Sequence, residues 1–449
     1  MNGESILNGA WTPCFPNPAL APSFRLENGK LEMASGDEGR VFGYCESRVE
    51  ALPEAYYRFD VAFFLNANQP LPSGGMSDPY ANTNLLRSVL CLVEWETGRG
   101  AGRLNAQEIM SKFLLRDETV YGSLICRAPR GTRCAKLQLG LRYAANMKIV
   151  FCGAVWHETE PPKPRKAKIG VCRWNPAKEE GADAYHAQLA RLLESAGVAA
   201  CDLFLLPEFC DTYHWKENLL SAVALTDNPT VKTAAEYARK HHMYVIAPVA
   251  ERDGDCVFNT SALIGRDGRL AGKYRKTHLY WPEVCCWGLT PGDDFPVFHL
   301  DFGKIGIETC YDNWNADVCK LLALKGAELI LMPNEGYDPL LMPARAVDNR
   351  VYMAVSSLAF EGEVYNAKGE KIGREEGMIK TAEIDMDERI PPYPVAGGCC
   401  NYAMGARRSV HNSVSDRLYR ELALAFNKWE NTDEGFIDPR GDISGDLAR

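Results

Sequence analysis

The sequence predicts an all-β antiparallel sandwich followed by a layered α/β domain. Up to residue 158, short runs rich in aromatic and branched side chains are separated by Gly, Pro and Asn, a spacing typical of antiparallel sheets. From residue 167 on, strand-like and helix-like segments alternate, and this alternation indicates an α/β architecture. The Pro- and Lys-rich stretch at 159–168 is typical of an extended linker.

A chain of 449 residues is long enough for two or three domains. We therefore expect a β-sandwich at 1–160, an α/β domain at 166–390 and a C-terminal tail at 391–449. The tail is Pro- and Gly-rich at its start, and the helical pattern VSDRLYRELALAFNKWE follows before a polar end.

The first region contains six strand-like runs. Alternation is clearest at Leu137, Leu139 and Leu141, which share one face of a strand. The segment NAQEIMSKFLL is ambiguous between helix and strand. In chain order the six runs are KLEMASG, YYRFDVAFFL, RSVLCLVEWE, GSLICRAP, KLQLGLRY and MKIVFCGAVWHE.

The second region opens with the strand AKIGVCRW and the helix DAYHAQLARLLESAG, in which Tyr185, Leu189 and Leu192 lie on one face. Asp267-Gly268 marks a hairpin. The remaining expected elements are the strand CDLFLLPE, the helix NPTVKTAAEYARKHH, the strand MYVIAPVAE, the hairpin arms VFNTSALIG and RLAGKYRKTHL, the strand KIGIETC, the helix NADVCKLLALKG, the strand AELILMP, the helix and strand in RAVDNRVYMAVSSLAF, and a last strand in GMIKTAEIDMDE.

Composition excludes several classes of function. A net charge of −9 with no long basic run argues against nucleic acid or an acidic membrane as partner. No apolar run reaches membrane-spanning length, and the start lacks the pattern of a secretory signal, so we expect a cytoplasmic protein. The 16 scattered cysteines suit reduced thiols. The pairs Cys285–Cys286 and Cys399–Cys400 lack partners at ligand spacing, so no metal is expected.

Cys310 is a candidate nucleophile because the strand KIGIETC ends on it and a helical pattern follows. Asp312, Asn313 and Asn315 offer N-caps for that helix. A helix start favours a thiolate over a thiol, and the next amide can face a developing oxyanion. The alternative interpretation is a buried structural cysteine.

A thiol nucleophile needs a base, and the sequence offers three. Glu208 follows the apolar strand LFLLP, where a carboxylate is costly unless it is paired. Glu335 is its rival, because LKGAELILMPNE echoes GVAACDLFLLPE, although we expect Glu335 on a loop. His278 keeps a Cys–His pair open. Lys276 could stabilise a thiolate and an oxyanion, or could be a solvated surface charge.

Several segments, in order, resemble the carbon–nitrogen hydrolase (nitrilase) superfamily. They are PE at the end of a strand, K-x-H-L after a hairpin, PGDDFPVF, a strand-end C-Y-D followed by a helix and GAELILMP, ARAVDNRVYMAV, and AEIDMDE. The resemblance covers about 167–390. It implies an α-β-β-α layered sandwich in which Cys310 is the nucleophile, Glu208 the base and Lys276 the third member, with no metal or organic cofactor.

The resemblance also implies supporting residues. Lys276 and the backbone amide of Tyr311 would hold the oxyanion, and Glu283 is the acid available as the second Glu that the family often carries. Pocket-lining candidates are Trp314, Asn334 and Glu335. The chain departs from many amidases of the family after Cys-Tyr-Asp, where Asn313 and Trp314 stand in place of the usual Arg and Pro-Glu run.

These features lead us to expect a hydrolase that cleaves the C–N bond of a small amide through a thioester. N-carbamoyl amide or nitrile hydrolysis is an alternative, and a ligand- or carbohydrate-binding protein with an inert hydrolase-like domain is another. The region before 160 resembles galactose-binding-like jelly rolls, so a carbohydrate is a candidate ligand there, although Trp95 and Trp156 are better explained by core packing. The family implies a homodimer or higher homo-oligomer.

Overall fold

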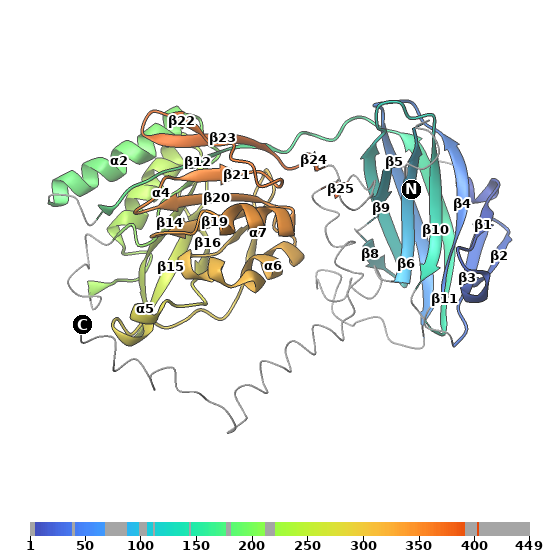
Figure 1. Ribbon diagram of the computed structural model, residues 1–449, viewed down its shortest axis with the longest axis horizontal. Coiled ribbons are helices and arrows are strands. Elements are labelled where there is room, and N and C mark those ends of the chain that lie inside the picture. Colours follow the sequence, from blue (N-terminus) through green and yellow to red (C-terminus); the bar gives the residue numbers. More distant parts are fainter. Residues whose placement is uncertain are drawn as a thin grey trace, which may run out of the picture.

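The computed structural model describes residues 5–37, 41–67, 88–97, 106–110, 113–142, 145–176, 181–211, 221–390 and 402–403. Two pairs of β-sheets account for most of it, one pair on each side of the extended segment at 159–165 (Figure 1). The tail expected at 391–449 lies outside the described residues, except for 402–403. Among the described residues, no helix combines the length and apolar character needed to cross a membrane.

The first pair of sheets is antiparallel throughout. Short 3₁₀ helices at η1 (Ile6–Asn8) and η2 (Pro18–Leu20) accompany it. One sheet has the order β1 (Thr12–Cys14), β4 (Phe42–Glu50), β10 (Cys134–Arg142), β6 (Val89–Glu96), β7 (Ala106–Ile109). The other has the order β2 (Ser23–Glu27), β3 (Lys30–Ala34), β11 (Met147–Glu158), β5 (Tyr56–Ala67), β9 (Thr119–Arg127), β8 (Phe113–Arg116).

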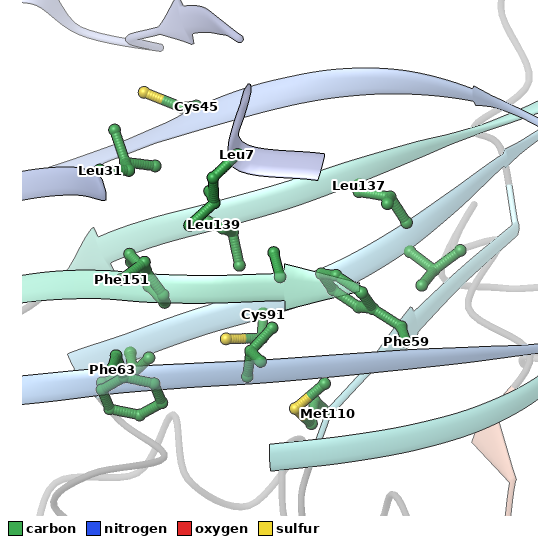
Figure 2. Close-up of a cluster of buried hydrophobic side chains, with 14 of the residues drawn as sticks. Leu7, Leu31, Cys45, Phe59, Phe63, Cys91, Met110, Leu137, Leu139 and Phe151 are labelled. Atoms are coloured by element: carbon green, nitrogen blue, oxygen red, sulfur yellow. The ribbon is translucent and has the colours of Figure 1, made fainter. Parts of the chain in front are cut away.

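The inner faces of these two sheets share one apolar core. Phe59 and Phe63 on β5 and Phe151 on β11 belong to the same buried cluster as Leu137 and Leu139 on β10 (Figure 2). Alternate residues along each strand point inward, as the period of two in the sequence predicted. The expected antiparallel sandwich is therefore confirmed.

Two uncertain points in this region are decided by packing. The ambiguous segment NAQEIMSKFLL contributes strands β7 and β8, one to each sheet. Trp95 is fully buried and its indole N–H donates to Glu108 at 3.2 Å, while Trp156 stacks on Tyr57 with ring centroids 4.7 Å apart. Both tryptophans therefore serve the core, as core packing predicted.

The second pair of sheets mixes parallel and antiparallel strands. One has the order β16 (Leu270–Arg275), β15 (Cys256–Ile264), β14 (Tyr244–Asp253), β13 (Leu203–Leu205), β12 (Lys166–Val171), β23 (Ile379–Asp385), β22 (Arg374–Glu376). The other has the order β17 (Val297–His299), β18 (Lys304–Ile307), β19 (Leu329–Asn334), β20 (Tyr352–Ser357), β21 (Glu363–Tyr365). The pairs β12–β13, β13–β14, β18–β19 and β19–β20 are parallel.

Helices cover the outer face of each of these sheets. A core that includes Ile169, Leu205, Ile307 and Leu331 lies between the sheets. A second core joins the first sheet to α2 (Ala182–Val198) and α4 (Pro229–His241), and a third joins the other sheet to α6 (Ala316–Leu324) and α7 (Leu341–Asn349). The helices lie on opposite sides of the paired sheets in Figure 1. The α-β-β-α layered sandwich is confirmed.

Three short elements complete the described structure. They are α5 (Trp281–Cys285), the 3₁₀ helix η5 (Cys310–Trp314) and a two-stranded ladder of β24 (Arg389–Ile390) with β25 (Tyr402–Ala403). Strand β18 ends at Ile307, so Cys310 opens η5 instead of ending the strand as the sequence suggested. Every cysteine among the described residues is a free thiol, in agreement with the expected reduced state.

Candidate active site

A buried ammonium lies at the centre of the site. Lys276 follows β16 and is only 1% exposed, and its Nζ donates to Glu208 Oε1 at 2.9 Å and to Glu283 Oε2 at 2.7 Å. Glu208 comes from the loop after β13, and Glu283 comes from the first turn of α5. Two carboxylates therefore share one cation in a part of the molecule from which water is largely excluded.

An asparagine also connects the two carboxylates. Asn259, buried on β15, uses its Nδ2 to donate to Glu208 Oε1 and to Glu283 Oε1, both at 2.8 Å. Each acid thus has one amide donor and one ammonium donor. Fully hydrogen-bonded pairing of this kind is what makes buried carboxylates tolerable.

Electrostatics in the cluster follows from this shared pairing. Burial disfavours the charged form of Lys276, yet the carboxylates of Glu208 and Glu283 outweigh burial and raise the pKa of Lys276 above its ordinary value. Burial is the largest influence on Glu283 and raises its pKa, Lys276 opposes this rise, and Glu208 adds to it. Lys276 is therefore a permanent cation at neutral pH.

Cys310 joins this cluster from the other sheet. Burial is the largest influence on the Cys310 thiol, and the charge of Glu208 is the next; both raise the pKa of the thiol well above its ordinary value. Lys276 and the backbone of Glu335 oppose this shift. A side-chain hydrogen bond to Glu208 also contributes to the rise. The three residues Glu208, Lys276 and Cys310 therefore lie within interaction range of one another.

The resting state of Cys310 differs from the one expected from the sequence. We expected the start of a helix to favour a thiolate, but η5 is a 3₁₀ helix of five residues, and burial beside a carboxylate favours the neutral thiol. A proton acceptor must therefore act on Cys310 during any attack by the sulfur. Its backbone φ of +48° lies in the left-handed region, which a non-glycine residue adopts only where the surrounding structure holds it.

Asp312 is the residue that holds the Cys310 turn in place. Its carboxylate is fully buried, and it accepts hydrogen bonds from its own turn and from the segment around Lys276. The donors are Thr309 N (2.8 Å), Tyr274 Oη (2.7 Å), His278 N (2.9 Å) and Thr277 Oγ1 (3.1 Å). One side chain therefore joins the segment that bears the sulfur to the segment that bears the ammonium.

His278 takes part in this junction and not in the thiol cluster. Its Nδ1 lies 3.2 Å from Asp312 Oδ1, and the hydrogen bond to Asp312 raises the pKa of the imidazole. Sequence reasoning offered Asp312 as a helix cap and His278 as an alternative base. Asp312 is the third residue of η5, and its side chain accepts from Thr309 N–H in a capping box at the start of that 3₁₀ helix.

The four other residues proposed for the site are placed differently from one another. Tyr311 is partly exposed, with its ring 5.5 Å from that of Tyr280. Trp314 is 55% exposed at the end of η5, and no contact between it and the three clustered residues is recorded in the described part of the chain. Asn334 is buried. It lies on the same face of β19 as Met332, which packs toward α6 and α7. Glu335 follows β19 directly.

Two features of the site were missed by sequence reasoning. Asn259 was visible only as the first of three polar residues in VFNTSALIG, a weak signal in a segment that we assigned to a hairpin arm. The Tyr274, Thr277 and Asp312 network had no periodic signature, because its members come from segments far apart in sequence. Among the described residues, no group of three or more His, Cys, Asp and Glu side chains is arranged to hold a metal ion.

Comparison with known proteins matches this domain. The family model described as "Carbon-nitrogen hydrolase" matches residues 168–373. A nitrilase from Pyrococcus abyssi is 34% identical over 193 residues, which cover 41% of this chain and 72% of that protein. Omega-amidase NIT2 of Xenopus tropicalis is 28% identical over 251 residues, which cover 48% of this chain and 89% of that protein.

Among solved structures, Nit3 of Saccharomyces cerevisiae is similar with a TM-score of 0.43 at 23% identity, covering 56% of this chain and 96% of that one. The matched segment contains β12 through β21, and with them the whole cluster around Lys276. On the family match and the identity to the Pyrococcus protein, the chain belongs to the carbon–nitrogen hydrolase family.

Proposed function

We propose that this protein hydrolyses the C–N bond of a small amide through a thioester on Cys310, with Glu208 as the base and Lys276 as the oxyanion donor. The observation that carries the proposal is the contact of one buried ammonium with a buried carboxylate beside the thiol of Cys310, at a strand-to-helix turn. The nitrilase and omega-amidase names of the relatives support the class of reaction.

Glu208 is suited to carry the proton because its two oxygens have different partners. Lys276 and Asn259 both donate to Oε1, so Oε2 remains for the Cys310 thiol. As sulfur bonds to the amide carbon, the S–H proton moves to Glu208. When the C–N bond breaks, Glu208 gives this proton to the leaving nitrogen.

Lys276 is suited to hold the oxyanion because an ammonium has three N–H groups and two of them are used. Glu208 and Glu283 take these two, so the third is available to a substrate oxygen. The Tyr311 amide is the second donor in this proposal, since the first N–H groups of a helix have no partner within it. Glu283 keeps Lys276 in place from its other side.

The second half of the reaction regenerates the enzyme. A water molecule gives one proton to Glu208 and attacks the thioester carbon, the C–S bond breaks, and the proton returns to sulfur. The products are a carboxylic acid and the thiol. The amide, one water molecule and the side chains named here balance these steps.

The test is turnover and trapping with the full-length chain. We expect the wild-type protein to release ammonia from primary amides, and mass spectrometry after rapid quenching to find an acyl group on the peptide that contains Cys310. Cys310→Ala should abolish both signals, whereas Cys256→Ala, at an exposed cysteine outside the site, should abolish neither. Turnover that survives in Cys310→Ala would exclude the mechanism.

The same assay separates the alternatives. N-carbamoyl compounds and nitriles run beside the amides report on those substrate classes. A Cys–His hydrolase requires that His278→Ala stops turnover while Glu208→Gln does not, the reverse of our expectation. A binding protein with an inert domain forms no acyl adduct with any of them.

Three further proposals concern the domain boundaries, the location and oligomeric state of the protein, and a ligand of the sandwich domain. The chain is divided at 1–160, 166–390 and 391–449, which is supported by the absence of shared strands between the two pairs of sheets in the described residues. The protein is a cytoplasmic homodimer or higher homo-oligomer, and free thiols support a reducing compartment. A carbohydrate on the sandwich domain is the third, and glycan-array binding by the full chain would test it.

A further inference from the structure

Glu335 has its backbone fixed beside the reacting sulfur. Its carbonyl accepts hydrogen bonds from Ala359 N at 3.0 Å and from Ser357 Oγ at 2.8 Å, which tie it to the end of β20. Its own backbone acts on the Cys310 thiol by a hydrogen bond. The carboxylate of Glu335 is therefore only one side-chain length from the position of a scissile carbon.

Among the carboxylates of the site, that of Glu335 is the one without a protein partner. Glu208 and Glu283 share Lys276, and Asp312 accepts at least four hydrogen bonds. Within the described residues no ion pair or hydrogen bond reaches the carboxylate of Glu335, and the residue is exposed. Burial, then Glu208, raise the pKa of Glu335, and Lys276 opposes this rise, so its carboxyl group lies within electrostatic range of the cluster.

The charges of the site do not balance. The single ammonium of Lys276 is already bonded to Glu208 and Glu283, and Glu335, directly after β19, has no cation in contact with its carboxyl group among the described residues. The surplus negative charge is at the open side, where Glu335 meets solvent. A substrate that brings a positive charge reduces the repulsion, and one that brings a second carboxylate adds to it.

Aromatic rings adjoin the same loop. Phe360, 49% exposed, covers Gly336, where an added Cβ would lie 3.1 Å from the ring. Tyr337 packs against Phe360 with centroids 5.8 Å apart. Aromatic faces present negative potential to an ammonium group, so these rings beside Glu335 in the chain suit a cationic substrate chain.

We propose that Glu335 selects amides whose acyl chain carries a cationic nitrogen, so that the enzyme prefers ω-amino amides to neutral or acidic ones. This inference rests on the proposed function, since it concerns the substrate of the same site. The ammonium of the substrate pairs with Glu335 while its carbonyl lies between Cys310 and Lys276. Glu335 in this arrangement touches the substrate but not the reacting atoms.

The test compares three amides of the same shape and leaving group. They are 5-aminopentanamide, which is cationic, hexanamide, which is neutral, and glutaric acid monoamide, which is anionic. We expect kcat/KM to fall in that order at pH 8, by about tenfold per step, as expected for one charge contact of moderate strength. Amides with chains one methylene shorter and one methylene longer control for the effect of chain length on the result.

Variants locate the effect at Glu335. Glu335→Gln should bring the ratio of cationic to neutral kcat/KM close to one, and Glu335→Lys should turn the preference toward the anionic amide. Asp338→Asn is the matched control, because Asp338 lies in the same loop but its carboxylate caps the Leu340 N–H at 2.8 Å. The ratio should keep its wild-type value in this control.

Binding to Cys310→Ala separates this inference from the proposed function. Calorimetry on that variant measures the affinities of the same three amides without turnover, and we expect the cationic amide to bind tightest. Equal affinities, or a preference that survives in Glu335→Gln, would overturn the inference while leaving amide hydrolysis intact. Absence of hydrolysis with the binding order retained would overturn the mechanism instead.

Discussion

Two strand ends in this protein carry nearly the same sequence and present their acids to opposite environments. LFLLPE ends the stretch at β13, and LILMPNE ends the stretch at β19. Glu208 is 2% exposed and bonded to Lys276 and Asn259, whereas Glu335 is exposed and has no such partner in the described residues. One additional residue between the proline and the acid accompanies this difference.

The difference teaches how a buried carboxylate is maintained. A carboxylate can be buried only where a cation and hydrogen-bond donors compensate for lost hydration. Asn259 on β15 and Lys276 after β16 supply a hydrogen-bond donor and a cation to Glu208. Among the described residues, no cation or hydrogen-bond donor contacts the Glu335 carboxylate. The first acid is therefore available for proton transfer in a dry environment, and the second for contact with a solvated group.

The largest expected effect contrasts these two acids directly. Glu208→Gln removes the proposed proton carrier, so kcat for a neutral amide should fall by about 10²–10⁴-fold, the usual contribution of general acid–base catalysis. Glu335→Gln should cost far less with the same amide, because its carboxylate does not reach the reacting atoms. Steady-state kinetics on purified proteins measures both. Equal losses would end the distinction between the two acids.

The next effect removes the cation from the buried side. Lys276→Ala takes away an oxyanion donor and should lower kcat by about 10²–10³-fold. It also leaves Glu208 and Glu283 adjacent and unpaired, which should destabilise the fold by about 3–5 kcal/mol at neutral pH. Thermal unfolding and kinetics are the two measurements.

The sign of the pH dependence makes this prediction sharper. Without Lys276, repulsion and burial raise the pKa of at least one of the two acids above its unfolded value. The variant should therefore be most stable at low pH and lose stability as pH rises through that pKa. A variant whose loss of stability relative to the wild type is the same at pH 4 and pH 8 would contradict this account of the cluster.

A smaller effect concerns the residue that joins the two halves of the site. Asp312→Asn keeps the size of the side chain but replaces an acceptor oxygen with a donor, facing the N–H and O–H groups now bonded to it. Misplacing the sulfur by about 1 Å should lower kcat by up to roughly 100-fold with a smaller change in KM. Asp317→Asn, in the first turn of α6, is the control and should keep wild-type kcat.

The pH profile of Asp312→Asn distinguishes positioning from general damage. The Asp312 carboxylate raises the pKa of His278, so the variant should shift the imidazole titration toward lower pH. NMR of the His278 ring follows this titration. An unshifted titration together with normal kcat would show that the junction does not depend on Asp312.

The smallest expected effect concerns Glu308, a buried acid that no cation contacts among the described residues. Glu308 is fully buried, accepts from Asn313 Nδ2 at 2.6 Å, and burial raises its pKa to about 7. A pKa raised above the unfolded value means that stability is greatest below about pH 4.5 and is lost as pH rises to 7. The total loss is roughly 3 kcal/mol.

Glu308→Gln removes this titration. Its stability relative to the wild type should rise between pH 4.5 and pH 8 by up to about 3 kcal/mol, since the glutamine does not ionise. Urea unfolding at several pH values provides the measurement. If the free energies of unfolding of the two proteins change in parallel with pH, ionisation of the buried Glu308 does not destabilise the wild type.

Much of the architecture was readable from local patterns. The strands β5, β10 and β11 and the helices α2 and α4 were found from periodicity, because a half-buried element repeats apolar residues at its own period. The trio Glu208, Lys276 and Cys310 was proposed from the order of family-like segments, and the structure brings the three side chains near one another. The segment now divided between β7 and β8 was undecided, because its residues do not favour one period and the partner strands decide it.

The orientation of single side chains was beyond the reach of such patterns. Asn334 and Glu335 were both proposed for the pocket, yet the strand places Asn334 among the residues under α6 and α7. Asn259 and Asp312 became recognisable only when four segments met around Lys276. The protonation state of Cys310 was predicted wrongly, because the sequence indicated the neighbouring helix start but not the burial of the thiol.

The sequence by itself determined the order of elements, the two core patterns and the presence of a thiol, an acid and an amine with family-like spacing, since these depend on residues near one another in the chain. The tertiary structure alone decided which acid is buried, which is free and what state the thiol adopts. The reason is that hydration is lost, and charges are compensated, by neighbours that come from distant parts of the chain.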